Sequence, residues 1–195
     1  MANKPSLLLY LHGFNSSPQS HKAKVMKAYC QQHRPDILLL APQIPCFPEQ
    51  AAQFLLATVE RYKGDYTIGL VGSSLGGYMS TWLNHQFGFR AVLINPAVKP
   101  YELLVDFLGE QVNPYTQQSY QLEHKHIDEL QALDVVTLTQ PGDFWLMQQE
   151  GDEVLDYRQA VAKYAQSKQT IEEKGDHSFV GFERFPEHII SFLKL

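Results

Sequence analysis

The chain has 195 residues and a formal net charge of −5, with 44% hydrophobic and 19% charged residues. This composition is typical of a globular protein and excludes a disordered chain. The length predicts one domain over residues 1–195, with a core large enough to need no disulfides. The acidic balance provides no basic surface, so we expect no nucleic-acid partner.

Two further features indicate where the protein resides. Cys30 and Cys46 are too few for a disulfide framework or a zinc site and indicate reduced thiols. The apolar run 7–11 is shorter than the core of a signal peptide. The stretch 68–89 lacks Asp, Glu, Lys and Arg, but its serines and glycines exclude a membrane span. We therefore expect a cytoplasmic protein that binds no membrane.

Six short runs, taken in chain order, are predicted as strands. The first four are apolar at consecutive positions and are bounded by Gly, Pro, Asn or Asp, which is typical of strands buried on both faces of a parallel sheet. The six runs are Ser6–His12, Asp36–Pro42, Tyr66–Gly72, Arg90–Pro96, Phe144–Glu150 and Gln169–Gly175.

Helical patterns alternate with these strands. In 49–62 the apolar residues recur at intervals of three and four, and Pro48 stands at a suitable start. The stretches 75–87, 154–165 and 183–193 also predict helices. Alternating strands and helices predict an α/β fold with right-handed crossovers.

Residues 97–140 break this alternation and are too many for a simple loop. The stretches 100–109 and 120–133 have helical patterns, which predict a lid-like helical insertion. Ligands of α/β proteins bind at the carboxyl ends of the strands, so we expect the insertion to lie over that edge.

Three aromatic residues of the insertion are candidate walls of a substrate pocket. They are Tyr101, Phe107 and Tyr115. The alternative is that the same side chains seal a helix of the insertion onto the core, which is the ordinary role of buried aromatic residues.

The stretch LVGSSLGGYMS, residues 70–80, places two serines between glycines at the end of an apolar run. A phosphate-binding P-loop would need a lysine, and none follows Gly76 or Gly77. The dinucleotide pattern G-x-G-x-x-G fits no frame of this stretch. Both phosphate-binding interpretations are therefore weak.

The nucleophile-elbow pattern G-x-S-x-G fits in one frame and selects Ser74, between Gly72 and Gly76. In this motif the serine occupies a sharp strand-to-helix turn with strained backbone angles. Side chains two residues away on either side would clash with neighbouring backbone, which explains the glycines. The alternative is a plain turn between a strand and a helix.

Acyl transfer also needs backbone N–H groups that stabilise an oxyanion. One is the N–H that follows the nucleophile, here that of Leu75. The loop 9–18 follows the first strand, contains Gly13 and supplies the second N–H from Phe14. His12 lies in the same stretch, and we expect it to pack or hydrogen-bond beneath the loop.

The general base is predicted to be His177. It lies in a loop after the last strand, at the carboxyl edge where a base must reach the serine. His124 and His126 are two residues apart on a predicted helix and face different ways, which argues against a metal pair. The remaining histidines outside the first loop lie on polar or helical stretches: His21, His33, His85 and His188.

The acid that orients the base is predicted to be Asp152, in the turn after the fifth strand. Its alternative role is to cap the following helix. Asp143 starts that strand and should lie at the opposite edge, while Asp156 should lie inside the helix. Asp176 adjoins the predicted base, and neighbouring side chains usually diverge. The order Ser, Asp, His along the chain is the α/β-hydrolase order.

Five blocks of the chain resemble the YqiA-type small bacterial esterases of the α/β-hydrolase superfamily. In chain order they read LYLHGFNSSPQSHKA, VGSSLGGYMSTWL, INPAVKPYELL, QEGDEVLDYRQAV and GDHSFVGFE. The resemblance implies a minimal α/β-hydrolase fold, a three-layer sandwich around a mostly parallel six-stranded sheet. It also implies Ser74 as nucleophile, Asp152 as acid and His177 as base, with no cofactor. We expect no metal site.

The expected function is that of a serine hydrolase that cleaves short- to medium-chain carboxylic esters through an acyl-enzyme. Its expected partner is a small acyl ester or thioester. An acyl-CoA thioesterase with the same triad stays open, although only Lys99 and Lys125 in the insertion offer basic groups for CoA. A ligand-binding protein of this fold without catalysis is the alternative of another class.

Overall fold

The central sheet of the protein has six strands in the order β2-β1-β3-β4-β7-β8, and every neighbouring pair is parallel. The computed structural model describes residues 4–195. The strands are β1 Ser6–Leu11, β2 Ile37–Leu40, β3 Thr67–Ser73, β4 Ala91–Ile94, β7 Phe144–Gln149 and β8 Lys168–Glu172. The six predicted strands and the mostly parallel sheet are thus confirmed.

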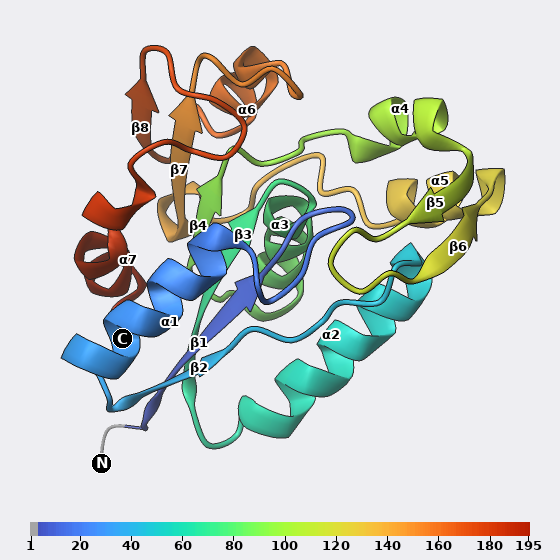
Figure 1. Cartoon of the computed structure of the whole chain (residues 1–195). Helices are drawn as coiled ribbons and strands as arrows, with labels where there is room; N and C mark the ends of the chain where they lie inside the picture. The colour runs from blue at the N-terminus through green and yellow to red at the C-terminus, as the bar shows by residue number, and fades with distance from the viewer. Residues whose placement is uncertain (1–3) are drawn as a thin grey trace.

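Helices cover both faces of this sheet (Figure 1). One face packs against α1 His21–His33 and α7 Pro186–Leu193. The other face packs against α2 Pro48–Tyr62, α3 Leu75–Phe87 and α6 Tyr157–Lys163. The arrangement is the three-layer sandwich implied by the resemblance.

The two hydrophobic cores explain why the strands are apolar at consecutive positions. In β1, Leu8 and Tyr10 pack toward α1 and α7, whereas Leu7, Leu9 and Leu11 pack toward α2 and α3. Successive side chains of a strand point to opposite faces, so a strand covered on both sides must be apolar at every position.

Two predicted helices differ from the structure in their bounds, and a third helix was not predicted. Helix α6 begins at Tyr157, three residues later than predicted, because Asp156 is its N-cap. Helix α7 begins at Pro186, after a short 3₁₀ turn, Phe182–Arg184. The sequence analysis did not predict α1, whose buried side chains are only Ala23, Met26 and Cys30.

The insertion 97–140 contains a β-hairpin as well as helices. Its elements are α4 Pro100–Leu104, a 3₁₀ turn Val105–Phe107, β5 Gly109–Val112, β6 Ser119–Leu122 and α5 His124–Gln131. The helix predicted over 120–133 was therefore wrong for its first three residues. Tyr120 and Leu122 are buried and alternate with exposed neighbours, which is the period of a strand.

The hairpin reaches the loop that follows β1, at the carboxyl edge of the sheet. The Asn113 side chain donates to the carbonyl oxygen of Ser16 (3.0 Å), and the Tyr120 hydroxyl donates to the Asn15 side chain (2.7 Å). Both acceptors belong to the loop that follows β1. Helix α5 packs further out, against α4 and against α2 (Figure 1).

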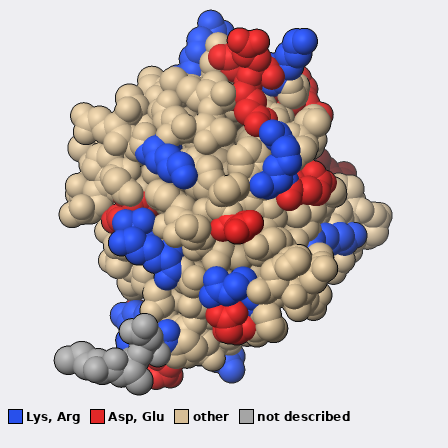
Figure 2. Space-filling model, turned by 90° about the vertical axis from the view of Figure 1, so that its left-hand side faces the viewer, with Lys and Arg blue, Asp and Glu red and all other residues tan. Residues whose placement is uncertain are grey.

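The surface carries mixed charge. On the face shown in Figure 2, lysines and arginines are interspersed with aspartates and glutamates, without a large area of one sign. None of the helices within residues 4–195 is both long and apolar enough to span a bilayer.

A buried tyrosine ties the insertion to the main core and provides the first prediction. The Tyr78 hydroxyl on α3 donates to the carbonyl oxygen of Leu130 on α5 (2.5 Å). In Tyr78→Phe that buried carbonyl loses the hydroxyl donor and keeps only backbone N–H donors such as that of Leu133, so the free energy of unfolding should fall by about 1 kcal/mol. Urea denaturation measures this change. Tyr29→Phe is the control, because the Tyr29 hydroxyl makes no hydrogen bond within residues 4–195; an equal loss in both variants would contradict the prediction.

Candidate functional site

Ser74 occupies the sharp turn between β3 and α3. Its backbone has φ 55° and ψ −120°, a conformation that residues other than glycine rarely adopt. The turn is held by the segment after β4: the Ser74 N–H donates to the carbonyl oxygen of Ile94 (3.1 Å), and the Ser74 carbonyl accepts from Ala97 N–H (3.1 Å). The strain expected for a nucleophile elbow is present at this serine.

The flanking glycines allow backbone segments to touch. A Cβ atom on Gly72 would overlap the carbonyl oxygen of Gly76, and one on Gly76 would overlap the carbonyl oxygen of Leu11. Because Gly76 has no side chain, the first turn of α3 packs directly against the end of β1. Close packing is thus the physical reason for the glycine spacing on which the sequence analysis selected Ser74.

The structure brings together three side chains that the sequence analysis selected. The Ser74 Oγ lies 3.1 Å from His177 Nε2, and His177 Nδ1 lies 2.8 Å and 3.0 Å from the two carboxylate oxygens of Asp152. Ser74 follows β3, Asp152 follows β7 and His177 follows β8. The carboxyl ends of parallel strands meet at one edge of a sheet, which explains how distant segments converge.

The hydrogen bonds assign the protons of this group. Burial raises the pKa of Asp152, but hydrogen bonds from His177 and from the N–H groups of Leu155 and Val154 outweigh it and hold that pKa below its ordinary value. The Asp152 side chain is fully buried and ionised, so it only accepts. His177 Nδ1 therefore carries the proton, and Nε2 is the acceptor that faces the Ser74 hydroxyl.

The competing aspartates have other roles. Asp152 does accept from two backbone N–H groups of the following turn, but the N-cap of α6 is Asp156, which accepts from Arg158 N–H. The prediction that Asp156 lies inside the helix was wrong. Asp143 precedes β7 and lies 3.8 Å from Arg90, which precedes β4, at the opposite edge. Asp176 accepts from the Ser178 hydroxyl.

Two buried polar residues hold the loops of Asp152 and His177. Asn95, which follows β4, donates to the carbonyl oxygens of Asp176 (2.9 Å) and His177 (3.2 Å) and accepts from Gln149 N–H (2.9 Å). The Gln149 side-chain oxygen accepts from the N–H groups of Asp176 (3.2 Å) and Val180 (2.9 Å). Neither residue was predicted from the sequence; the available signal was a polar residue at the carboxyl end of an apolar strand.

The same two loops touch through glycines. A Cβ on Gly151 would overlap the carbonyl oxygen of Gly175, and a Cβ on Gly175 would overlap the Gln149 side chain. Gly175 also has a φ of 76°, which favours glycine. The loops that carry the carboxylate and the imidazole are therefore fixed against each other by backbone packing.

Two backbone N–H groups lie beside Ser74 without an intramolecular acceptor. A Cβ on Gly13 would lie 3.1 Å from Ser74 Cβ, so the loop after β1 rests on the serine. Within residues 4–195, neither Phe14 N–H nor Leu75 N–H donates a hydrogen bond. These are the two donors that the sequence analysis expected to line an oxyanion hole.

His12 lies beneath that loop, as expected. Its Nδ1 donates to the carbonyl oxygen of Gly13 (2.9 Å), and its Nε2 accepts from Ile44 N–H (3.0 Å). Both ring nitrogens are engaged and the side chain is buried, so His12 supports the loop that carries Phe14.

A polar groove of about 400 Å³ opens at Ser74. Its walls come from the loop after β1, the first turn of α1 and the loop that carries His177. Lys22, Ser20 and Tyr115 line it together with Ser74 and His177. The pocket was predicted in the insertion, so the contribution of residues 15–22 to its walls was not predicted.

A small apolar pocket of about 40 Å³ lies on the other side of the turn. Leu75, Met79, Ile44, Phe14 and Tyr120 line it, so it adjoins both free N–H groups. The carbonyl of a ligand at Ser74 would thus have an apolar pocket on one side and a polar groove on the other.

The three predicted wall residues have different positions. Tyr115 lines the polar groove. Phe107 packs edge-on against Phe14, with 5.9 Å between the ring centroids. Tyr101 does not line either space at Ser74: its hydroxyl donates to Asp134 (3.0 Å), so it seals α4 onto the core, the alternative that the sequence analysis left open.

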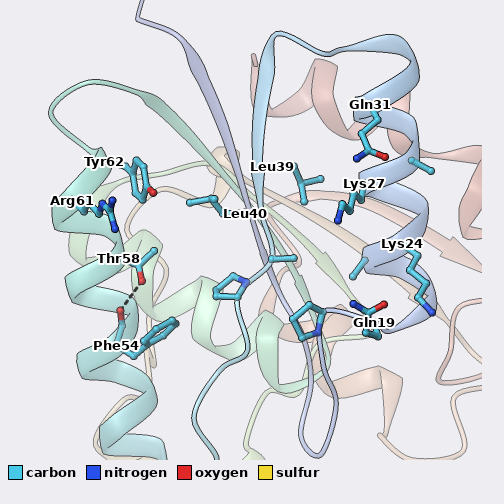
Figure 3. A pocket seen from close by; sticks show the side chains of 15 residues that line it. Gln19, Lys24, Lys27, Gln31, Leu39, Leu40, Phe54, Thr58, Arg61 and Tyr62 are labelled. Carbon is cyan, nitrogen blue, oxygen red and sulfur yellow. Dashed lines mark hydrogen bonds between the residues drawn. The ribbon is translucent and has the colours of Figure 1, made fainter. Parts of the chain in front are cut away.

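A larger hollow, of about 600 Å³, lies away from these residues between α1 and α2, beside the edge strand β2 (Figure 3). Lys24 and Lys27 line it from α1, and Arg61 and Tyr62 line it from α2. None of Ser74, Asp152 and His177 lines it. Within residues 4–195 no group of three or more His, Cys, Asp or Glu side chains is placed to hold a metal ion.

The second prediction concerns Asn95. In Asn95→Ala the His177 loop loses two hydrogen bonds, so His177 should shift and the reaction of Ser74 with a fluorophosphonate probe should slow roughly 10- to 100-fold. Asn84→Ala is the matched control, because Asn84 is also buried and donates to a carbonyl, that of Phe89 (2.7 Å), at the far end of α3. Equal slowing in both folded variants would show that Asn95 has no positioning role.

The third prediction concerns His12. Burial lowers the pKa of His12 when folded, outweighing its hydrogen bond to Gly13. Below about pH 6.5 the unfolded state therefore binds a proton that the folded state does not, so the free energy of unfolding falls as the pH falls. Urea denaturation at pH 7.5 and 5.0 should show a larger fall for wild type than for His12→Gln. The exposed His33→Gln should behave as wild type, and equal falls in all three would refute this.

Comparisons with known proteins agree with this architecture. Est1E from Butyrivibrio proteoclasticus superposes with a TM-score of 0.75 at 16% identity, covering 99% of this chain and 88% of that chain. Alpha/beta hydrolase domain-containing protein 10 from mouse superposes with a TM-score of 0.70 at 16% identity, covering 100% and 91%. The chain has the α/β-hydrolase fold.

Sequence comparison identifies the family. A UPF0227 protein of Shewanella sp. strain MR-7 is 30% identical over 102 residues, which are 50% of this chain and 55% of that relative. The aligned part thus spans about half the length of this curated relative. The model of the uncharacterised protein family UPF0227 matches residues 7–194. This chain belongs to the UPF0227 family, the YqiA family that its five sequence blocks resemble.

Proposed function

We propose that this protein is a serine hydrolase that cleaves carboxylic esters of short- to medium-chain acyl groups. One observation carries the proposal: Ser74, His177 and Asp152 form a continuous hydrogen-bonded chain. Two N–H groups that have no acceptor among residues 4–195 lie beside its serine. A nucleophile, a base, an orienting acid and an oxyanion hole are the parts that acyl transfer needs.

The first half of the proposed reaction forms an acyl-enzyme. Neutral His177 takes the hydroxyl proton of Ser74 as the serine oxygen attacks the ester carbonyl. Asp152 stabilises the resulting imidazolium through the Nδ1–H bond. The N–H groups of Phe14 and Leu75 bind the oxyanion, each contributing about 3 kcal/mol to lowering the barrier. The alcohol then leaves with the proton from His177 Nε2.

The second half releases the acid. A water molecule gives a proton to His177 as its oxygen attacks the acyl carbonyl, and the tetrahedral species collapses to expel Ser74. His177 returns the proton to the serine oxygen. No cofactor takes part, and His177 donates each proton that it accepts, so it ends the cycle neutral.

The two spaces at Ser74 support an assignment of the two ends of the substrate. The apolar pocket at Leu75 and Met79 suits the acyl chain, and its small volume of about 40 Å³ favours short chains. The polar groove toward Ser20 and Lys22 suits the alcohol portion. Structural neighbours fit this proposal: Est1E has a solved complex with ferulic acid, a carboxylic acid, and the esterase domain of a Rhodothermus marinus protein has the same fold.

Covalent labelling tests the proposal. A fluorophosphonate probe should label wild type and Ser73→Ala, whereas Ser74→Ala should not react. With 4-nitrophenyl butyrate, Ser74→Ala should lose a factor of roughly 10⁴ or more in kcat, and Asp152→Asn roughly 10³ to 10⁴. An adduct that persists in Ser74→Ala would overturn the nucleophile assignment. No adduct on wild type would favour a ligand-binding protein without catalysis.

The same assay separates the ester and thioester alternatives, since both would use one triad. Turnover of 4-nitrophenyl esters and of acyl-CoA, each with acyl chains of increasing length, should give the higher kcat/KM for short esters. A consistently higher kcat/KM for acyl-CoA would make the protein a thioesterase.

A further inference from the structure

The polar groove contains buried hydroxyl groups that the proposed reaction does not use. Tyr10 is 1% exposed, and its hydroxyl makes no hydrogen bond within residues 4–195. The Ser20 hydroxyl is likewise buried without a partner. The two groups lie near each other and near Ser73, but not in hydrogen-bonding geometry. Buried donors without partners are costly and uncommon, so two of them in the wall of one groove are donors available to a ligand.

Lys22 adds a positive charge to the same wall. Its Nζ donates to the carbonyl oxygen of Ser178 (2.8 Å), which leaves further N–H donors of the ammonium group available. No carboxylate of residues 4–195 forms an ion pair with it. Burial lowers its pKa to about 8, although Asp176 and Asp152 act in the opposite direction. A partly buried ammonium group that forms no ion pair favours a bound anion.

The first turn of α1 contributes its backbone. This helix has thirteen residues, and its N-cap residue Ser20 makes no capping hydrogen bond. The N–H groups of His21, Lys22 and Ala23 have no acceptor within residues 4–195. Free N–H groups at the positive end of a helix dipole form a favourable site for an anion.

The acidic groups around the groove are engaged elsewhere. Glu153 accepts from the backbone N–H of His177 (3.0 Å), and Asp176 accepts from the Ser178 hydroxyl. Glu183 pairs with His21. Asp152 is committed to His177 and to the following turn. Glu153 and Asp176 accept only from neutral donors and keep their negative charges, whereas Lys22 supplies a positive charge that forms no ion pair within residues 4–195.

We propose that this wall, formed by Lys22, Ser20, Tyr10 and the first turn of α1, is a subsite for a carboxylate or phosphate group on the alcohol portion of the ester. The assignment to the alcohol portion rests on the proposed function, because the acyl chain is placed in the apolar pocket. The subsite makes the protein selective for anionic esters and distinguishes it from an esterase of neutral acyl esters.

Three butyrate esters of similar shape test this selectivity. Their alcohols are 4-hydroxybenzoate, 4-hydroxyphenyl phosphate and 4-hydroxybenzamide, which carry a carboxylate, a phosphate and a neutral amide. Wild type should favour an anionic ester over the amide, and Lys22→Met should reduce that preference roughly tenfold, mainly through KM. Lys22→Arg should retain it. The anionic ester whose kcat/KM falls most in Lys22→Met shows whether the subsite binds a carboxylate or a phosphate.

The pH dependence of this preference gives a second readout. As the pH rises through about 8, Lys22 loses its charge, so wild type should lose its preference for anionic esters. Lys22→Arg should keep the preference at pH 9.5, because arginine stays charged. Lys24→Met is the control, because Lys24 is the next lysine on α1 but lines the separate hollow of Figure 3. This variant should keep the wild-type preference for anionic esters.

Two results would overturn the subsite. One is an equal loss on all three esters in Lys22→Met, which would limit Lys22 to supporting the Ser178 carbonyl. The other is the absence of any anionic preference in wild type. If no ester is cleaved, calorimetry on Ser74→Ala still tests the subsite. Binding of 4-hydroxybenzoate or 4-hydroxyphenyl phosphate, but not of 4-hydroxybenzamide, supports it. Equal affinity for the anionic and neutral compounds, or no binding of any of them, refutes it. Failure of the proposed hydrolysis is thereby separated from failure of the subsite.

Discussion

The backbone contact between Gly76 and the Leu11 carbonyl is the constraint on which the rest of the site depends. Without a side chain at Gly76, the first turn of α3 rests on the end of β1, and the following loop rests on Ser74. This contact brings a free N–H of that loop beside one from α3. It also holds Ser74 in a left-handed conformation that an isolated chain would avoid. Any side chain at Gly76 would separate the two segments.

Buried polar groups fix the remaining part of the site. Asn95 and Gln149 lie at the ends of neighbouring strands and hydrogen-bond to the loop of His177. Such a network is stable only when each buried donor and acceptor has a partner, so it allows one arrangement of the loop. The imidazole is therefore positioned by buried side chains at the ends of β4 and β7, which hold the loop that carries it. Its tautomer follows from the ionised carboxylate behind it.

The loop after β1 and the start of α1 contribute side chains to the spaces on both sides of Ser74. Phe14 adjoins the apolar pocket, whereas Ser20 and Lys22 face the polar groove. The insertion reaches this region through a hairpin that hydrogen-bonds to Asn15 and leaves its helices at the periphery. The chemical character of the groove thus comes mainly from one short segment near the N-terminus, and the insertion supports that segment from outside.

The sequence by itself determined the strands and the edge at which Ser74, Asp152 and His177 lie, because period and spacing are local properties and parallel strands share a carboxyl edge. It also selected Ser74 over its neighbour through the glycine spacing. Only the tertiary structure decided the hairpin at Tyr120, the outward position of Tyr101, and the grouping of Tyr10, Ser20 and Lys22 at one groove. These features depend on contacts between segments far apart in the chain, which no local pattern records.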